Sequence, residues 1–375
     1  MNQAICPIFT SLGKPFERGV RFGAFAKELI RSGVRHYVEM WEQNTGRSSA
    51  ELFELAKQFE PVILDYDVRL MQEIAGVSNG AGIPLHEILM LNARYEIMLM
   101  AFFGGGAAEL PTDGCTSFAI SSQATSDRHT YVAQNWDLTK EAGKRCIILD
   151  IQQDDGPNIV THTEAGLLAH KGMNSAGLGI CINSIGTQHD VFAPKVPVFA
   201  MARAILNATT IDEAQRAVER ADRTASVNIT IGCEDGSVAC LEITPVDVER
   251  IEPQDGRVAH ANVLCGDVAE RNLKDTLAER LPVFVKRSRR AQQLVADASI
   301  DLEKVQSMLR DRANTPESIC RHLDDQPLEA PQGLKMETLA SVIFDLNERK
   351  FWLAEGPPDR CDYKQLDFPS LGRSD

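Results

Sequence analysis

The hydrophobic pattern of this chain changes from helical to strand-like close to residue 104, and this change limits the folds open to it. Ahead of that point, apolar residues recur at i, i+3 and i+4, which is typical of amphipathic helices. The stretches with this pattern are "FGAFAKELIRSGVRHYVEMWEQ", "SAELFELAKQFEPVILDYDVRLMQEIAGVS" and "PLHEILMLNARYEIMLMAFF", the last with proline in its first turn. We therefore expect three or four helices before Gly104.

After Cys115, short alternating or β-branched runs separated by turn signals predict strands. These runs lie near 115–122, 130–135, 145–151, 158–163, 168–173 and 178–183. A helical pattern at about 196–221, four strand-like runs up to about 263, a helical block over about 270–310 and a hairpin in "TLASVIFDLNERKFWLAEG" follow. Two groups of antiparallel strands bracketed by helices favour a layered α/β (α+β) sandwich over an alternating βαβ fold.

Composition excludes several classes of partner. A chain of 375 residues with 43% hydrophobic residues can bury a large core. Its net charge of −14 argues against nucleic acid or an anionic membrane as the main partner, so we expect a small-molecule ligand.

Cysteine usage and the two ends of the chain bear on metals and location. The 9 cysteines are scattered without the spacing of a zinc site or a disulfide framework, so we expect no metal and a reducing compartment. No Gly-rich phosphate motif follows a strand, and we expect no cofactor. The start of the chain lacks the features of a signal peptide, and no apolar run is long enough to cross a bilayer. We expect a cytoplasmic protein.

The stretch "LPTDGCTSFAI" marks the junction between the helical and strand-like parts. A Gly-Cys pair alone is more often a turn with a buried, unreactive cysteine. If the bond between Gly114 and Cys115 were cut, however, Cys115 would carry both a thiol and an α-amine with a pKa of about 7.7 to 8.0. Such an amine can act as the base for its own thiol. Gly114, without a Cβ, tolerates a strained conformation that brings its carbonyl to that thiol.

Two other stretches supply polar groups for such a site. If the first two strands after Gly114 pair as a hairpin, Asp137 at the end of "QNWD" approaches Cys115 and could hold the new amine, although an Asp there is commonly a turn residue. Asn262 in "AHANVL" could donate to the oxyanion of a tetrahedral intermediate. His260, two residues earlier, could line the substrate pocket or be an ordinary core histidine.

Together these residues resemble the acyl-coenzyme A:6-aminopenicillanic acid acyltransferase (isopenicillin N acyltransferase) family, which is a peptidase C45-like branch of the N-terminal nucleophile (Ntn) hydrolases. The resemblance rests on "EIAGVSNGAGIPLHEILMLNARYE", "DGCTSFAI", "QNWD", "AGLLAHKGMNSAGLGICINSI", "HANV" and "TLASVIFDL", in the family's order. It implies a four-layer αββα sandwich with two stacked, mainly antiparallel sheets. It also implies cleavage into fragments 1–114 and 115–375, which stay associated as a heterodimer within one domain.

The resemblance assigns roles residue by residue. It implies that Cys115 is the nucleophile of both self-cleavage and turnover, that Asp137 is a carboxylate near the new amine, and that Asn262 is an oxyanion-hole donor. Asn183, in "GICINSI", is similar to an asparagine that related bile salt hydrolases place near the site. Those enzymes have an arginine where this chain has Gln134, which disfavours a conjugated bile acid and leaves Gln134 as a candidate substrate-binding residue.

The expected activity is hydrolysis of an amide or acyl thioester, or transfer of its acyl group to an amine, through an acyl-enzyme. Acyl-coenzyme A is a possible substrate. Two alternatives stay open: an intact chain in which Cys115 pairs with His260, and a degenerate member that binds an acylated ligand without chemistry. Cleavage of the chain separates the main hypothesis from both alternatives.

Overall fold

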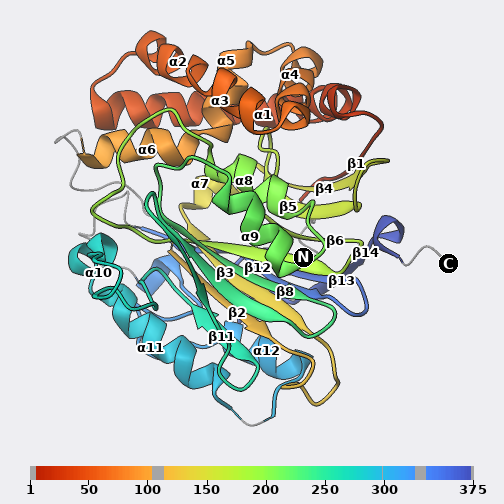
Figure 1. Ribbon diagram of the computed structural model, residues 1–375, viewed down its shortest axis with the longest axis vertical. Coiled ribbons are helices and arrows are strands. Elements are labelled where there is room, and N and C mark those ends of the chain that lie inside the picture. Colours follow the sequence, from red (N-terminus) through yellow and green to blue (C-terminus); the bar gives the residue numbers. More distant parts are fainter. Residues whose placement is uncertain (1–5, 104–113, 298, 326–334, 373–375) are drawn as a thin grey trace.

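Two β-sheets stack face to face, with helices on both outer sides (Figure 1). The structure is a computed structural model that describes residues 6–103, 114–297, 299–325 and 335–372. The glycine-rich run before Cys115 lies outside these residues. The four layers of helix, sheet, sheet and helix confirm the predicted αββα sandwich.

The first sheet has eight strands in the order β1-β4-β5-β6-β7-β8-β9-β10. Their bounds are β1 Ile8–Leu12, β4 Cys146–Gln152, β5 Ile159–Glu164, β6 Lys171–Asn174, β7 Leu178–Ser184, β8 Val227–Cys233, β9 Val238–Ile243 and β10 Val248–Ile251. All neighbours are antiparallel except β1, which pairs with β4 in parallel. We expected only helices before Gly104, and β1 departs from this because its pairing partner lies far along the chain.

The second sheet has six antiparallel strands in the order β11-β2-β3-β12-β13-β14. Their bounds are β2 Gly114–Ile120, β3 Tyr131–Leu138, β11 Arg257–His260, β12 Glu337–Asp345, β13 Lys350–Ala354 and β14 Lys364–Asp367. The hairpin expected after Gly114 is present as β2 and β3. Its register sets Gly114 opposite Asp137 and Cys115 opposite Trp136.

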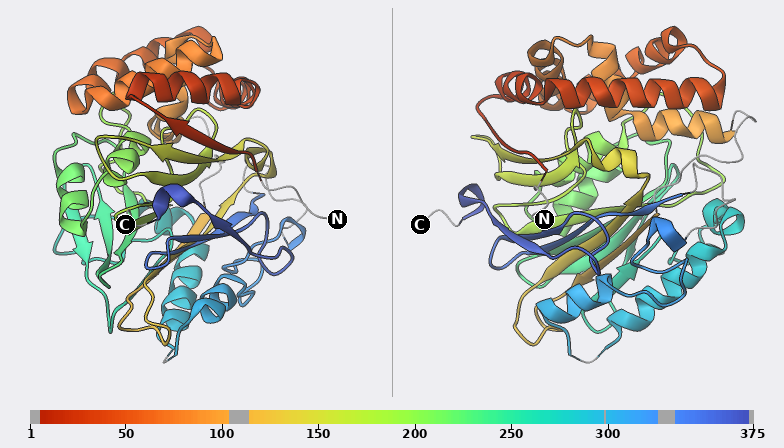
Figure 2. Two further views of the ribbon diagram at one scale, coloured as in Figure 1. Left: turned by 90° about the vertical axis from the view of Figure 1, so that its right-hand side faces the viewer. Right: turned by 180° about the vertical axis from the view of Figure 1, so that it is seen from behind.

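The outer face of the first sheet is covered mainly by the N-terminal helices (Figures 1 and 2). These are α1 Pro15–Thr45, α2 Ser49–Lys57, α3 Phe59–Tyr66, α4 Val68–Ala81, α5 Leu85–Asn92 and α6 Arg94–Phe103, joined by α8 Val198–Ile205 and α9 Ile211–Glu219. The helical segment divides more finely than expected because local caps interrupt it. Gly46 ends α1 in the left-handed conformation, and the side chains of Ser48 and Asp67 cap α2 and α4.

Close backbone contact joins α1 to α4. A Cβ on Gly19 would lie 2.1 Å from the Glu73 carbonyl oxygen, and one on Gly76 would lie 2.2 Å from the Phe16 carbonyl oxygen. Only glycine allows the two helices to approach so closely.

The outer face of the second sheet is covered by α11 Val283–Val295 and α12 Leu302–Leu309, with α10 Thr276–Arg280 beside them (Figure 2). The short α7 Lys140–Gly143 and the 3-10 turns Leu323–Asp325 and Pro369–Leu371 complete the described helices. One apolar cluster fills the space between the sheets, and two others fill the interfaces between sheets and helices. No helix in the described part of the chain is both long and apolar enough to span a bilayer.

Candidate active site

Cys115 is the second residue of β2, and its side chain belongs to the cluster between the two sheets. It packs in the same cluster as Trp136, whereas Phe118 and Ile120 of the same strand belong to the cluster on the other face. Cys115 is only 1% exposed. Its backbone N–H donates to Asn262 Oδ1 at 2.9 Å. The peptide nitrogen that cleavage would convert into an α-amine is therefore already held by a side-chain acceptor.

Charged side chains surround Gly114, the residue before Cys115. A Cβ on Gly114 would lie 3.0 Å from Nη1 of Arg287, 3.0 Å from Nη1 of Arg321 and 3.3 Å from Oδ2 of Asp137. Arg287 comes from α11, and Arg321 precedes β12. Because glycine has no side chain, two guanidiniums and a carboxylate can approach the Gly114–Cys115 peptide together.

Asp137 is fully buried and joined to this cluster on both oxygens. Arg287 Nη1 donates to Oδ2 at 3.0 Å, and Thr338 Oγ1 donates to Oδ1 at 2.7 Å. Burial raises the pKa of Asp137, although the Arg287 and Arg321 guanidiniums and the Thr338 hydroxyl act in the opposite direction. Burial likewise lowers the pKa of Arg287 to about 10, against the effect of Asp137. Because both side chains are buried away from water, the charge on each is stabilised mainly by the opposite charge on the other.

Asn262 lies two residues beyond the end of β11 and uses both ends of its amide. Its Oδ1 accepts from the Cys115 N–H and from Arg287 Nη2, while its Nδ2 donates to Ser184 O at 2.8 Å and to Ser184 Oγ at 3.0 Å. In the uncut chain Asn262 thus offers its oxygen to Cys115 and its N–H groups to Ser184. Its role as an oxyanion donor stays a prediction.

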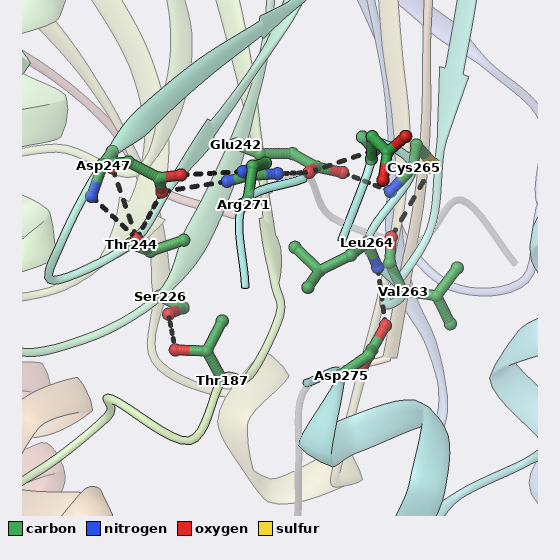
Figure 3. Close-up of polar contacts among 12 residues, drawn as sticks. Thr187, Ser226, Glu242, Thr244, Asp247, Val263, Leu264, Cys265, Arg271 and Asp275 are labelled. Atoms are coloured by element: carbon green, nitrogen blue, oxygen red, sulfur yellow. Dashed lines mark hydrogen bonds and ion pairs between the residues drawn. The ribbon is translucent and has the colours of Figure 1, made fainter. Parts of the chain in front are cut away.

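His260, the last residue of β11, points to a different partner. Its Nε2 lies 3.1 Å from Glu242 Oε1, and its strand neighbour on β2 is Ser117. Figure 3 shows that Glu242 also belongs to a charged network with Arg271. Burial tends to lower the pKa of His260, but Cys265 and Glu242 raise it to about 10. A histidine that is protonated at neutral pH makes a poor general base, which disfavours the intact-chain hypothesis.

Gln134 and Asn183 lie near each other between the sheets. Ser117, two residues after Cys115, donates its hydroxyl to Asn183 Oδ1 at 2.5 Å. Gln134, opposite Ser117 on β3, donates Nε2 to the Ile182 carbonyl. Asn183 Nδ2 and Gln134 Oε1 are buried without a hydrogen-bond partner among the described residues. Both amides therefore keep one polar atom for a ligand, and their predicted roles stay predictions.

A cavity opens beside Ser184, the residue that accepts from Asn262. It lies between α6, the segment after β7, and α10, and its larger lining residues are Tyr95, Met98, Leu99, Ile185, Leu277 and Arg280. Asp190 also lines it, and burial raises the pKa of Asp190 to about 6 although hydrogen bonds from Ser226 and Thr187 lower it. The cavity is lined mainly by apolar groups, together with the charged Asp190 and Arg280, and it includes Ser184, which accepts from Asn262.

Sequence reasoning missed Arg287, Arg321 and Thr338. Nothing in "KRSRRAQQ" separates Arg287 from the neighbouring arginines, and only its burial at 1% exposure does so. Thr338 opens "TLASVIFDL", so the motif pointed to the segment without indicating that its hydroxyl would reach Asp137.

Known proteins similar to this chain agree on one family. Residues 124–360, more than half of the chain, match the family described as acyl-coenzyme A:6-aminopenicillanic acid acyl-transferase. The 40 kDa form of acyl-coenzyme A:6-aminopenicillanic-acid-acyltransferase from Emericella nidulans is 28% identical over 357 residues, which is 94% of this chain and 93% of that protein.

Two solved structures have a weaker similarity to this chain. A mutant conjugated bile acid hydrolase from Clostridium perfringens has a TM-score of 0.42 and 13% identity, covering 68% of this chain and 97% of its own. Penicillin V acylase from Agrobacterium tumefaciens has a TM-score of 0.41 and 14% identity, covering 70% of this chain and 89% of its own.

Proposed function

The chain belongs to the acyl-coenzyme A:6-aminopenicillanic acid acyl-transferase family, and on this premise we propose that it is a cysteine amidohydrolase or acyltransferase that cleaves itself between Gly114 and Cys115. The observation that carries the proposal is the environment of that peptide. Asn262 Oδ1 holds the Cys115 nitrogen at 2.9 Å, while Asp137, Arg287 and Arg321 surround Gly114. A buried structural cysteine needs no such array of charges.

Self-cleavage proceeds in two steps. The Cys115 thiol adds to the Gly114 carbonyl carbon, the carbon–nitrogen bond breaks, and the nitrogen gains the thiol proton, so that a thioester joins Gly114 to Cys115. Water then hydrolyses this thioester to release the Gly114 carboxylate and the thiol. The nearby guanidiniums can stabilise the oxyanion that forms on Gly114 during both steps.

Turnover uses the amine that cleavage exposes. The α-amine takes the thiol proton, and the sulfur attacks the substrate carbonyl to form an acyl-enzyme. The leaving amine or thiol departs with a proton from the Cys115 ammonium. Water then gives hydrolysis, and an acceptor amine gives acyl transfer. Asn262 holds the α-amine through Oδ1, in the contact that it makes to the peptide nitrogen of the uncut chain.

Small acylated molecules are the proposed substrates. The cavity beside Ser184 supports an acyl group with apolar surface, because Met98, Leu99 and Leu277 line it. Amides and acyl thioesters, including acyl-coenzyme A, carry the carbonyl that the thiol requires. The protein needs no cofactor for this chemistry.

The two fragments are proposed to remain together after cleavage. Tyr37 and Arg94, from the N-terminal fragment, bond to the buried Glu164 of the other fragment at 2.9 and 2.8 Å. Glu73 of the first fragment lies 3.6 Å from Arg203 of the second. Separation would expose these buried charges together with the core between helices and sheet, so a stable heterodimer is expected.

The test compares purified wild type with the Cys115→Ala variant. Denaturing mass spectrometry should show wild-type fragments of 114 residues and 375 − 114 = 261 residues, while the variant stays whole and inactive. Both should be assayed with acyl amides and acyl-coenzyme A, with and without acceptor amines. Thiol-dependent turnover by an uncut wild-type chain would instead support the intact enzyme. Absence of both cleavage and turnover would support the degenerate binding protein.

A further inference from the structure

Three side chains that commonly bind metals converge outside the candidate active site. Cys320 and His322 are buried in the segment before β12, and Asp359 is an exposed residue between β13 and β14. Cys320 Sγ lies 3.1 Å from Asp359 Oδ1, His322 Nε2 lies 2.7 Å from the same oxygen, and Sγ and Nε2 are 3.9 Å apart. A single ion could contact all three atoms.

These separations are close to those of a metal site. With bonds of roughly 2.0–2.3 Å to zinc and tetrahedral angles, neighbouring ligand atoms lie about 3.4–3.6 Å apart. The separation of 3.9 Å between sulfur and nitrogen is about 0.3 Å longer than this range, and the separations of 3.1 and 2.7 Å to Asp359 are about 0.3 and 0.7 Å shorter. Because Asp359 is exposed, its carboxylate can move outward by the roughly 0.3–0.7 Å that is required.

A second cluster of the same residue types is less suited to an ion. Glu242, His260 and Cys265 also lie together, but Glu242 already has other partners. Arg271 Nη1 donates to it at 2.7 Å, and the backbone N–H groups of Cys265 and Gly266 donate to it as well (Figure 3). The adjacent guanidinium would repel a cation. At the first cluster the nearest contact of this kind is longer, 3.6 Å from Arg312 Nη1 to Asp359 Oδ2.

We propose that Cys320, His322 and Asp359 form a binding site for a divalent transition-metal ion, with zinc the best match. A thiolate and an imidazole select zinc over magnesium or calcium, and three protein ligands leave a fourth position for water. Zinc displaces the proton of the Cys320 thiol on binding, so that the thiolate and the Asp359 carboxylate balance its charge. Because the thiol must lose its proton on binding, affinity increases with pH.

The site would also act on the candidate active site through the backbone. Arg321 stands between the two buried ligands, and its guanidinium borders Gly114. Its N–H donates to Thr338 Oγ1 at 3.0 Å, and its carbonyl accepts from the Thr338 N–H at 3.0 Å. Thr338 in turn donates to Asp137. An ion that fixes the segment around Arg321 therefore restricts the positions of Arg321 and Asp137, two of the charged groups next to the scissile bond.

The experiment uses the full-length Cys115→Ala protein, so that neither the nucleophile nor self-cleavage contributes. The chain is loaded with zinc, desalted and assayed for bound metal, and the cobalt(II) form is examined for thiolate-to-metal charge-transfer absorption. Cys320→Ser and His322→Gln each remove a buried ligand. Asp359→Asn removes the exposed one with little risk to folding, and Cys361→Ser is a matched cysteine control.

We expect one zinc per chain and a thiolate band in the parent and in Cys361→Ser. Each ligand variant should bind zinc more weakly by at least the roughly 10–100-fold that follows loss of an outer-shell partner. Zinc should also raise the unfolding temperature of the parent but not of Cys320→Ser. A parent that retains no zinc, or ligand variants that bind it as the control does, would overturn the proposal. Because these measurements do not depend on catalysis, they can refute the metal site without refuting the proposed function, and the reverse.

Discussion

Replacement of Arg287 by methionine tests how much the charges of Arg287 and Asp137, beside Gly114, stabilise each other. Arg287 and Asp137 are 1% and 0% exposed and lie 3.0 Å apart. At an effective dielectric constant of 20, their attraction is about 5.5 kcal/mol. Removing one partner of a buried pair typically costs about 3–5 kcal/mol, because the other charge is left without compensation. Because the Arg321 cation still acts on the Asp137 carboxylate, Arg287→Met should lower the free energy of unfolding by an amount near the lower end of this range, about 3 kcal/mol.

The decrease in the free energy of unfolding caused by Arg287→Met should become larger as pH rises. Burial already raises the pKa of Asp137, and loss of the Arg287 cation raises it further. Above the ordinary aspartate pKa of about 3.9, the folded variant then binds a proton that the unfolded chain does not. Stability must fall as pH rises through that window. The penalty should thus be larger at pH 8 than at pH 5.

Urea denaturation of the uncleaved Cys115→Ala protein measures both effects without interference from self-cleavage. Asp137→Asn serves as the matched partner, because it removes the charge but keeps an oxygen for the Thr338 hydroxyl. The double variant Arg287→Met/Asp137→Asn should recover much of the loss. A penalty below about 1 kcal/mol, or one unchanged by Asp137→Asn, would refute the view that the two charges depend on each other.

Three further predictions concern single positions. Gly114→Ala sets a methyl group 3.0 Å from two guanidinium nitrogens, so overpacking of about 1–3 kcal/mol should slow processing, seen on gels as precursor; normal processing would contradict this. Asn262→Ala should lower kcat by about 10²–10³ if its amide is an oxyanion donor, and Asn262→Asp should lower it equally. Lower thermal stability with normal kcat would indicate a structural role. Burial raises the pKa of Glu96 from 4.5 to about 7, so the folded state binds the extra proton and stability should fall as pH rises across that range. Glu96→Gln should remove this slope in denaturation measurements, and an unchanged slope would show that another group causes it.

The parts of the fold that local pattern determines were predictable. The helical character before Gly104, the hairpin that sets Asp137 opposite Gly114, and the two helical blocks later in the chain all follow from periodicity over short windows. The finer division of the helices and the strand β1 did not. A helix cap such as Ser48 is a single residue, which a periodicity over many residues does not detect. The strand β1 is stabilised by a partner strand that begins at Cys146, far away in the sequence.

In the candidate site too, the residues recognisable from local sequence differ from those that tertiary packing brings together. Gly114 and Cys115 are adjacent in sequence, so their chemistry could be recognised there. Arg287 and Arg321 reach Gly114 only through the packing of α11 and of the segment before β12 on the second sheet. The orientation of the Asn262 amide is likewise a matter of tertiary contacts, since its hydrogen bonds to Ser184 span 78 positions.

The most direct test of the central claim is peptide mapping of an acylated protein. Processed enzyme is mixed with an acyl donor, quenched in acid, digested and sequenced by tandem mass spectrometry. We predict an acyl group on the sulfur of a peptide whose first residue is Cys115. An adduct on any other residue, or on a Cys115 still joined to Gly114, would contradict the account.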